Sequence, residues 1–286
     1  MKYNLAFKYR IYPNKDQELL INKTFGCVRF VYNTILYTAN KFYEETGKNK
    51  IITPASLKSE NQFLKEVDSL ALSNAQLNVK RSFTNFFQKR AKFPRFKSKK
   101  NNVKSYTTNC VNNSIRIEEN KYLVLPKLKK VKLKYHREIP KDYKIKSVTL
   151  TNSNGNYYVS VLTEFEKEIQ KNPSNDKVIG LDFSMSELFV SSENQRADYP
   201  KYFRMLEEKL KKLQKSLSRK VKFSKNWYKQ KAKISKLHEY IKNCRRDFLH
   251  KLSKKLSETY NAVVVEDLNM KGMSQALNFG KSVGDN

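Results

Sequence analysis

Cysteine is scarce in this sequence, and its three residues are far apart. Cys27, Cys110 and Cys244 form no CxxC pair anywhere in the 286 residues. Small secreted domains need dense, paired cysteines, so a disulfide scaffold is disfavoured and a reducing, cytoplasmic compartment is expected. A zinc site built from paired cysteines is excluded within this sequence, and no zinc is expected.

Long apolar runs are also missing. No segment approaches the roughly 20 apolar residues of a membrane-spanning helix. The N-terminus, MKYNLAFKYR, lacks the apolar core of a signal peptide. A membrane is therefore not an expected partner.

Acidic residues are few for the number of basic ones. The chain has 58 Lys and Arg against 27 Asp and Glu, and its formal net charge is +31. Self-repulsion of this size is tolerated mainly when a polyanion neutralises it, so nucleic acid is the expected partner. Aromatic residues make up 12% of the chain, which excludes a disordered basic tail because they supply a core and surfaces for base stacking.

The first hundred residues read as one strand followed by helices. Residues 3–13 alternate apolar and basic side chains, which predicts a strand. After Pro13 the apolar period becomes helical, with Asn14 or Asp16 as the N-cap, and further helical segments follow Pro54 and begin near Ser73. Basic residues on or after these helices are candidate nucleic-acid contacts: Lys80, Arg81, Lys97, Lys99 and Lys100.

Residues 103–165 return to a strand pattern. Two hairpins are predicted, with turns at Glu119–Asn120 and Asn154–Gly155. Together with the first strand they could close one β-domain into which the helices are inserted. The polar stretch 166–176 then reads as a linker.

The last part of the chain combines short strands with a long basic helical pair. Strands are predicted at 177–183 and 187–192, and an antiparallel helical pair over about 200–258. Between residues 201 and 255 the sequence holds 20 Lys or Arg against four Asp or Glu, which favours a nucleic-acid surface over an ordinary solvated face. Candidate contacts on this pair are Lys231, Lys233, Lys236, Arg245 and Arg246.

Two carboxylates stand at the ends of apolar strands in this last part. Asp182 closes the first strand, and Glu266 follows residues 262–265, which we expect to form a buried strand. If the two strands are adjacent, the carboxylates could share divalent cations, as two-metal phosphodiester cleavage requires. From spacing alone, a role as a cap or turn residue is the more common one for an acid at the end of a strand.

Several longer motifs resemble one known family. The stretch FKYRIYPNKDQELLINKTFGCVRFVYN is similar to the N-terminal signature of TnpB, the RNA-guided nuclease that insertion-sequence transposons encode. FFQKRAKFPRFKSKK is similar to that family's connection from its helical recognition region to its wedge domain. IGLDFSMSELFVSS and VVVEDLNMKGM resemble its first and second RuvC motifs, and RRDFLHKLSKKL the basic helix before the second.

The resemblance implies a multidomain fold that is α+β in its first part and α/β in its last. Residues 1–12 and 96–167 are expected to form a wedge β-barrel, with residues 13–95 inserted as a helical recognition domain. After a linker at 168–176, residues 177–286 are expected to form a truncated, RNase H-like RuvC domain. The family continues into a zinc module and a third RuvC motif with the last catalytic Asp, and neither is within this sequence.

The resemblance also assigns residues. Asp182 matches the family's first catalytic acid and Glu266 its second, and no residue here matches the third. Asn4, Ser69 and Ser73 align with contacts to the motif beside the DNA target, although the two serines differ from the best-known pattern. Any metal would be held by Asp182 and Glu266, so Mg²⁺ is expected only if nuclease activity persists, and no cofactor is needed for binding.

Two functions of different classes follow from these observations. One is a guide-RNA-directed, double-stranded DNA-binding protein without nuclease activity, which represses transcription by occupying a promoter, like the nuclease-dead TldR proteins of this family. The other is an RNA-guided endonuclease, shortened or completed by a second polypeptide, which the intact Asp182 and Glu266 favour. A plain helix-turn-helix repressor fits the basic N-terminal helices but not the RuvC half.

The implied partners are the same for both leading functions. They are a guide RNA and a double-stranded DNA target with an adjacent motif. One protein chain is expected for each guide RNA, in the bacterial cytoplasm and associated with the nucleoid.

Overall fold

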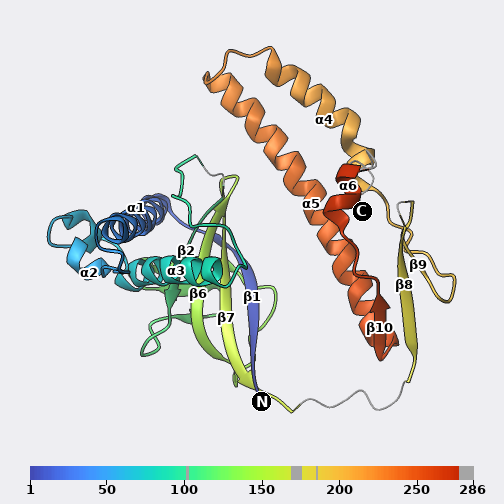
Figure 1. Cartoon of the computed structure of the whole chain (residues 1–286), viewed down its shortest axis with the longest axis horizontal. Coiled ribbons are helices and arrows are strands. Elements are labelled where there is room, and N and C mark those ends of the chain that lie inside the picture. Colours follow the sequence, from blue (N-terminus) through green and yellow to red (C-terminus); the bar gives the residue numbers. More distant parts are fainter. Residues whose placement is uncertain (101–102, 169–175, 185, 277–286) are drawn as a thin grey trace. The chain divides into compact units, whose positions relative to one another are not determined.

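The computed structural model describes residues 1–100, 103–168, 176–184 and 186–276 (Figure 1). The chain divides into two compact units, Met1–Glu168 and Ile169–Asn286. Mixed α and β structure is confirmed, and each unit is described by itself.

The first unit begins with strand β1 (Lys2–Tyr12) and the long helix α1 (Lys15–Thr46). Asn14 caps α1 as predicted: its side chain accepts a hydrogen bond from the Gln17 N–H at 2.8 Å, and the Gln17 side chain accepts one from the Asn14 N–H at 3.0 Å. The helix ends at Gly47, whose φ of 67° gives the left-handed conformation that favours glycine at this position.

Three shorter helical segments follow α1. They are α2 (Pro54–Leu57), a 3₁₀ turn (Gln62–Lys65) and α3 (Ser69–Phe87). Helix α3 begins four residues before the predicted Ser73 because Asp68 caps it, accepting a hydrogen bond from the Leu70 N–H at 3.0 Å. The residues that α3 buries are mostly small, so the apolar period is weak at its start: Ala71, Leu72, Ala75 and Val79.

The strands of the first unit form one antiparallel sheet of seven. Its members besides β1 are β2 (Val103–Asn109), β3 (Arg116–Glu118), β4 (Tyr122–Leu125), β5 (Lys129–Lys134), β6 (Lys144–Ser153) and β7 (Asn156–Glu166). The order is β2-β6-β7-β1-β5-β4-β3, so β1 pairs with strands far later in the sequence. The sheet curls (Figure 1), but no ladder among the described residues joins its edges β2 and β3, where the resemblance implies a closed barrel.

Both predicted hairpin turns are confirmed. Glu119 and Asn120 have φ values of 54° and 50°, and Asn154 and Gly155 have φ values of 51° and 80°. Positive φ at both central positions is the requirement of a type I′ turn, and Asn and Gly adopt it readily.

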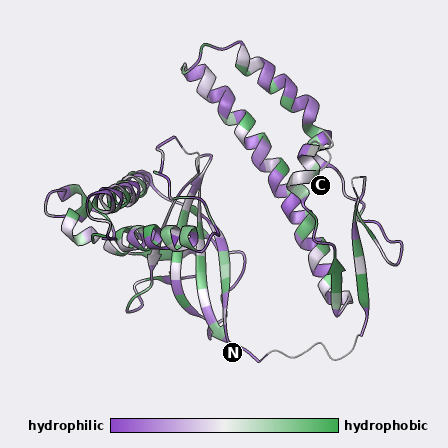
Figure 2. Ribbon diagram, viewed as in Figure 1, coloured by the Kyte–Doolittle hydropathy of each residue, from purple (hydrophilic) through white to green (hydrophobic). Residues whose placement is uncertain are grey.

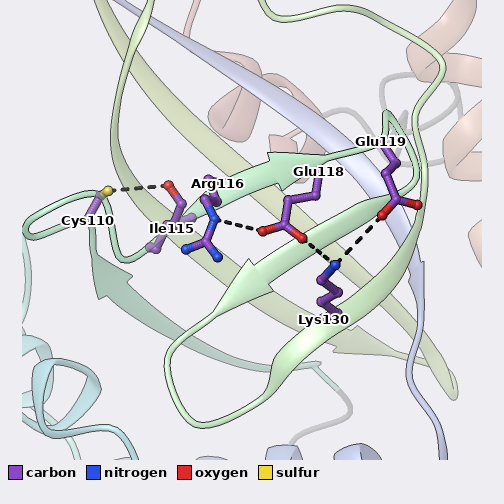
Figure 3. Close-up of polar contacts among 6 residues, drawn as sticks. All are labelled: Cys110, Ile115, Arg116, Glu118, Glu119 and Lys130. Carbon is purple, nitrogen blue, oxygen red and sulfur yellow. Dashed lines mark hydrogen bonds and ion pairs between the residues drawn. The ribbon is translucent and has the colours of Figure 1, made fainter.

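An ion-pair network lies beside the first of these turns (Figure 3). The Glu118 carboxylate contacts the Lys130 ammonium of β5 at 2.6 Å and the Arg116 guanidinium at 2.8 Å. The hydrogen bond from Lys130, followed by that from Arg116, lowers the pKa of Glu118. The network links β3 to β5 across β4, at an edge of the sheet.

The core of the first unit lies between the helices and one face of the curled sheet. Alternate residues of β1, Phe7, Tyr9 and Ile11, are buried there, together with one face of α1 that includes Ile21, Val31 and Ile35. Figure 2 shows the corresponding alternation of hydrophobic and hydrophilic residues along the strands. The helices therefore pack on the sheet as one hydrophobic core.

The second unit contains a small sheet and a helical hairpin. Strands β8 (Val178–Ser184), β9 (Leu188–Ser191) and β10 (Ala262–Val265) form a sheet in the order β10-β8-β9. Helices α4 (Tyr202–Ser218) and α5 (Lys225–Thr259) pair as predicted, through Leu210, Leu237 and Ile241. A short helix, α6 (Met270–Ala276), follows β10.

The prediction that residues 262–265 form a buried strand is wrong in one respect. The strand exists and is hydrophobic (Figure 2), but Val264 is 60% exposed and Val265 65% exposed. A run of valines favours a strand whether or not it is covered. The buried residues of α5 pack with α4, and so they do not cover the valines of β10.

None of the described helices is long and apolar enough to cross a bilayer.

Candidate functional site

Asp182 and Glu266 meet at one edge of the small sheet. Strands β8 and β10 are parallel neighbours, and Val265 is in register with Leu181. Glu266 follows Val265, and Asp182 follows Leu181, so the parallel register places Glu266 opposite Asp182. The expectation that adjacent strands bring the two acids together is confirmed, although Asp182 lies within β8, paired with Val190, and does not end it.

Both carboxylates line an open cleft of about 400 Å³. Its other walls come from β8, β9 and β10, including Gly180 and Val264, and from Ser192 just after β9. Asp182 and Glu266 are both exposed to solvent. Carboxylate oxygens are the ligands that Mg²⁺ and Mn²⁺ prefer, so the pair could contribute two ligands to such an ion. In the described parts of the chain, no group of three or more His, Cys, Asp or Glu side chains could hold a metal.

Hydrogen bonds around this edge fix the strands that carry the acids. The Ser192 hydroxyl accepts a hydrogen bond from the Gly180 N–H at 3.2 Å, and the Ser192 N–H donates to the Gly180 carbonyl at 2.9 Å. The Tyr260 hydroxyl, just before β10, donates to Glu193 at 2.8 Å, and this bond raises the pKa of Tyr260. The end of α5 is thus tied to the segment after β9.

The basic residues predicted on α5 differ in their surroundings. Lys231, Lys233 and Lys236 are exposed, with the Lys231 ammonium 5.0 Å from the centre of the Trp227 ring. Arg245 donates a hydrogen bond to the Tyr199 hydroxyl at 3.1 Å, so it helps to hold α5 to the segment before α4. Arg246 contacts His250 at 3.1 Å.

The residues aligned with contacts to the target-adjacent motif all lie in the first unit. Asn4 is exposed on β1, opposite Glu164 of β7. Ser69 is the first residue of α3, and its hydroxyl accepts a hydrogen bond from Lys58 at 2.8 Å. Ser73 lies one turn later and donates to the Ser69 carbonyl at 3.1 Å.

The remaining predicted basic residues also belong to the first unit. Lys80 and Arg81 are exposed on α3, and Lys99 and Lys100 are exposed in the segment before β2. Lys97 is held more firmly: its N–H donates to the Asn33 side-chain oxygen at 2.8 Å, and its carbonyl accepts from the Asn33 amide nitrogen at 3.0 Å.

A basic cleft in the first unit contains residues that the sequence analysis missed. It has a volume of about 480 Å³ and is lined by the predicted Lys97 and Lys99 together with Arg29 and Lys104. Arg29 could have been found from its spacing, because it shares a helix face with Asn22 and Gly26. Lys104 could not, because its place beside α1 depends on the pairing of β2 with β6.

Comparison with known proteins identifies the family. Residues 160–277 match a family model described as "Probable transposase", and residues 1–48 match one described as "Helix-turn-helix domain". A protein of Escherichia coli named "Putative RNA-guided DNA endonuclease InsQ" is 35% identical, over 96% of this chain and 69% of that protein. The chain belongs to the TnpB family.

One further relative resembles this TnpB-family chain in sequence, and one solved structure resembles it in fold. A Streptomyces pristinaespiralis protein with the same descriptive name is 32% identical, over 98% of this chain and 71% of that protein. The cryo-EM structure of a Cas12f1–sgRNA–target DNA complex contains a chain with a TM-score of 0.54 and 11% identity. The match covers 99% of this chain and 86% of that one, and it shows the fold.

Residues 1–48 match a model described as a helix-turn-helix, but in this TnpB-family chain they do not form that motif. They hold strand β1 and one uninterrupted helix of 32 residues, α1. A helix-turn-helix motif needs two helices joined by a short turn. The plain helix-turn-helix repressor considered from the sequence is therefore not supported by this segment.

Proposed function

We propose that this chain binds double-stranded DNA under the direction of a guide RNA and, by itself, does not cut it. Its relatives are named as RNA-guided DNA endonucleases, and its net charge of +31 suits two polyanionic partners. In a cell, occupancy of a promoter by such a complex would repress transcription. One protein chain for each guide RNA is part of the same proposal.

The proposal that the chain by itself does not cut DNA is supported by the cleft that Asp182 and Glu266 line. Two-metal hydrolysis needs ions about 3.5–4 Å apart, clamped on both the attacking and the leaving oxygen. Asp182 and Glu266 give one pair of ligands, and both are exposed to water, which weakens the hold of a small site on a cation. Binding of RNA and DNA uses phosphate contacts, so it requires neither a divalent ion nor zinc.

A second candidate is an RNA-guided DNA endonuclease. It is favoured by one specific observation: both acids are present, and the fold brings them to the same cleft. A third ligand would then come from a further segment or a second polypeptide. Asp182 and Glu266 would hold the divalent ion, which when bound would activate water for attack on phosphate.

A cleavage assay separates the two functions. The RNA-loaded protein is incubated with matched duplex DNA and Mg²⁺ or Mn²⁺, and with a duplex that does not match the guide. We expect matched-duplex binding without cleavage, and Asp182→Asn and Glu266→Gln should bind within about twofold of wild type, because each keeps the shape of the side chain and removes only one negative charge.

Asp267→Asn is the matched control, since it removes an exposed neighbouring carboxylate that does not line the cleft. Cleavage by the wild-type protein that Glu266→Gln abolishes and Asp267→Asn retains would establish the endonuclease. Equal binding of matched and unmatched duplexes would contradict guide-directed binding itself.

A further inference from the structure

The basic cleft beside α1 contains a glycine that the fold of the protein does not require. Gly26 lies in the interior of α1, where glycine lowers helix stability relative to alanine. Its backbone is helical, so no positive φ requires glycine. A Cβ built at this position meets no atom within 4 Å, so packing does not exclude a side chain either. Neither of the two usual structural reasons for a glycine applies here.

The surroundings of Gly26 form one wall of the cleft. Asn22 and Arg29 lie four and three residues from Gly26 and therefore share its helix face, and Phe25 also lines the cleft. The opposite wall is the segment with Lys97 and Lys99, together with Lys104 at the start of β2. Asn33 fixes this wall through its two hydrogen bonds to the Lys97 backbone.

The cleft carries positive charge without acidic partners. Among the described residues of the first unit, no carboxylate forms an ion pair with Arg29, Lys97, Lys99 or Lys104. The Lys97 ammonium lies 4.2 Å from the centre of the Tyr32 ring, and desolvation there lowers the pKa of Lys97 although the residue as a whole is exposed. An anion in the cleft would stabilise this ammonium, because a nearby opposite charge favours the charged form.

We propose that this cleft binds the sugar–phosphate backbone of a nucleic-acid strand, which approaches α1 closely at Gly26. The missing side chain leaves room for the backbone, and Arg29, Lys97, Lys99 and Lys104 neutralise the phosphates. Asn22, Ser98 and Ser105 add hydrogen-bonding groups to the same cleft. The site rests on the proposed function, since the strand belongs either to the guide RNA or to the DNA target.

The test uses the opposite effects that one methyl group should have on stability and on binding. Gly26→Ala should raise the melting temperature of the full chain by about 2–4 °C, because it improves helix propensity without a clash. The same variant should weaken nucleic-acid binding by about tenfold, and Gly26→Leu should weaken it further. If Gly26 had only a structural role, Gly26→Ala would not both stabilise the protein and weaken its binding.

Two variants that each remove one positive charge complete the experiment. Arg29→Gln should lower the slope of log affinity against log salt by about one, whereas Lys41→Gln, on the same helix but outside the cleft, should change it less. The measurements are made on guide-RNA binding by the RNA-free protein and on duplex binding by the RNA-loaded protein. Loss confined to the first assigns the strand to RNA, and loss confined to the second assigns it to DNA.

Two results would overturn the site. One is unchanged affinity for RNA and for DNA in Gly26→Ala and Gly26→Leu, and the other is a lower melting temperature for Gly26→Ala. Random-sequence RNA and duplex DNA are measured in parallel. If wild-type binding proves independent of the guide, the proposed function fails, but a tenfold loss on these probes would still support the cleft.

Discussion

At the scale of single residues, Val264 and Ile179 occupy neighbouring strands with very different exposure. Val264 of β10 is 60% exposed, whereas Ile179 of β8 is 1% exposed. Both are β-branched, and both belong to the same three-stranded sheet. Comparing substitutions at these two positions therefore measures how much burial contributes to the stability of this unit.

The same substitution should have unequal effects at these two positions. Val264→Asp places its charge in water and should cost about 1 kcal/mol or less, mostly from strand preference. Ile179→Asp buries an unpaired charge and should cost about 3 kcal/mol or more. Urea denaturation of both variants measures the difference, and similar losses would mean that β10 is covered in solution.

The outcome also bears on Glu266. The valines of β10 are exposed in the described structure, and its register beside β8 is held by the parallel ladder and by the Tyr260–Glu193 hydrogen bond. That register alone places Glu266 beside Asp182.

At the scale of elements, α5 presents Lys231, Lys233 and Lys236 to solvent while its apolar residues pack on α4. Among the described residues, none of these three lysines forms an ion pair, whereas Arg245 is held by its hydrogen bond to Tyr199. Exposed lysines of this kind contact phosphates without reading the bases.

The triple replacement of Lys231, Lys233 and Lys236 by Gln should weaken binding of all sequences to a similar degree. It should also lower the salt slope by about two to three, since each lost phosphate contact accounts for about one. Fluorescence anisotropy at several salt concentrations measures both quantities. Replacing the scattered, exposed Lys15, Lys41 and Lys141 removes the same charge and serves as the control. A loss limited to one DNA sequence would indicate base readout instead.

At the scale of the whole molecule, charge is the dominant property. A formal net charge of +31 on 286 residues favours a bound polyanion in any cell that makes the protein. Both units contribute, since the basic cleft lies in the first and the lysines of α5 in the second.

We therefore expect the protein purified at low salt to carry RNA of one defined sequence. Sequencing of the copurified nucleic acid should return a single structured species, because guide recognition selects one RNA, whereas charge alone selects none. Washing with about 1 M salt before elution is the control for loosely bound RNA, as it screens exposed phosphate contacts. A collection of random fragments after that wash would contradict the guide-RNA proposal.

Local sequence determined many features of this protein directly. The cap at Asn14, the turns at Glu119–Asn120 and Asn154–Gly155, and the apolar stripe within each of α4 and α5 all depend on residues within a few positions of one another. Backbone preferences and side-chain periods act over such distances, so they can be read before any folding is considered.

Only the tertiary structure decided what depends on contacts between distant segments. The pairing of β1 with β7, the exposure of Val264 and the meeting of Lys104 with Gly26 and Arg29 across a cleft each join parts that are remote in sequence. A valine run has the same strand preference whether it is covered or bare, and a lysine has the same charge wherever its strand is placed. Burial and proximity are set by packing, which the local pattern does not encode.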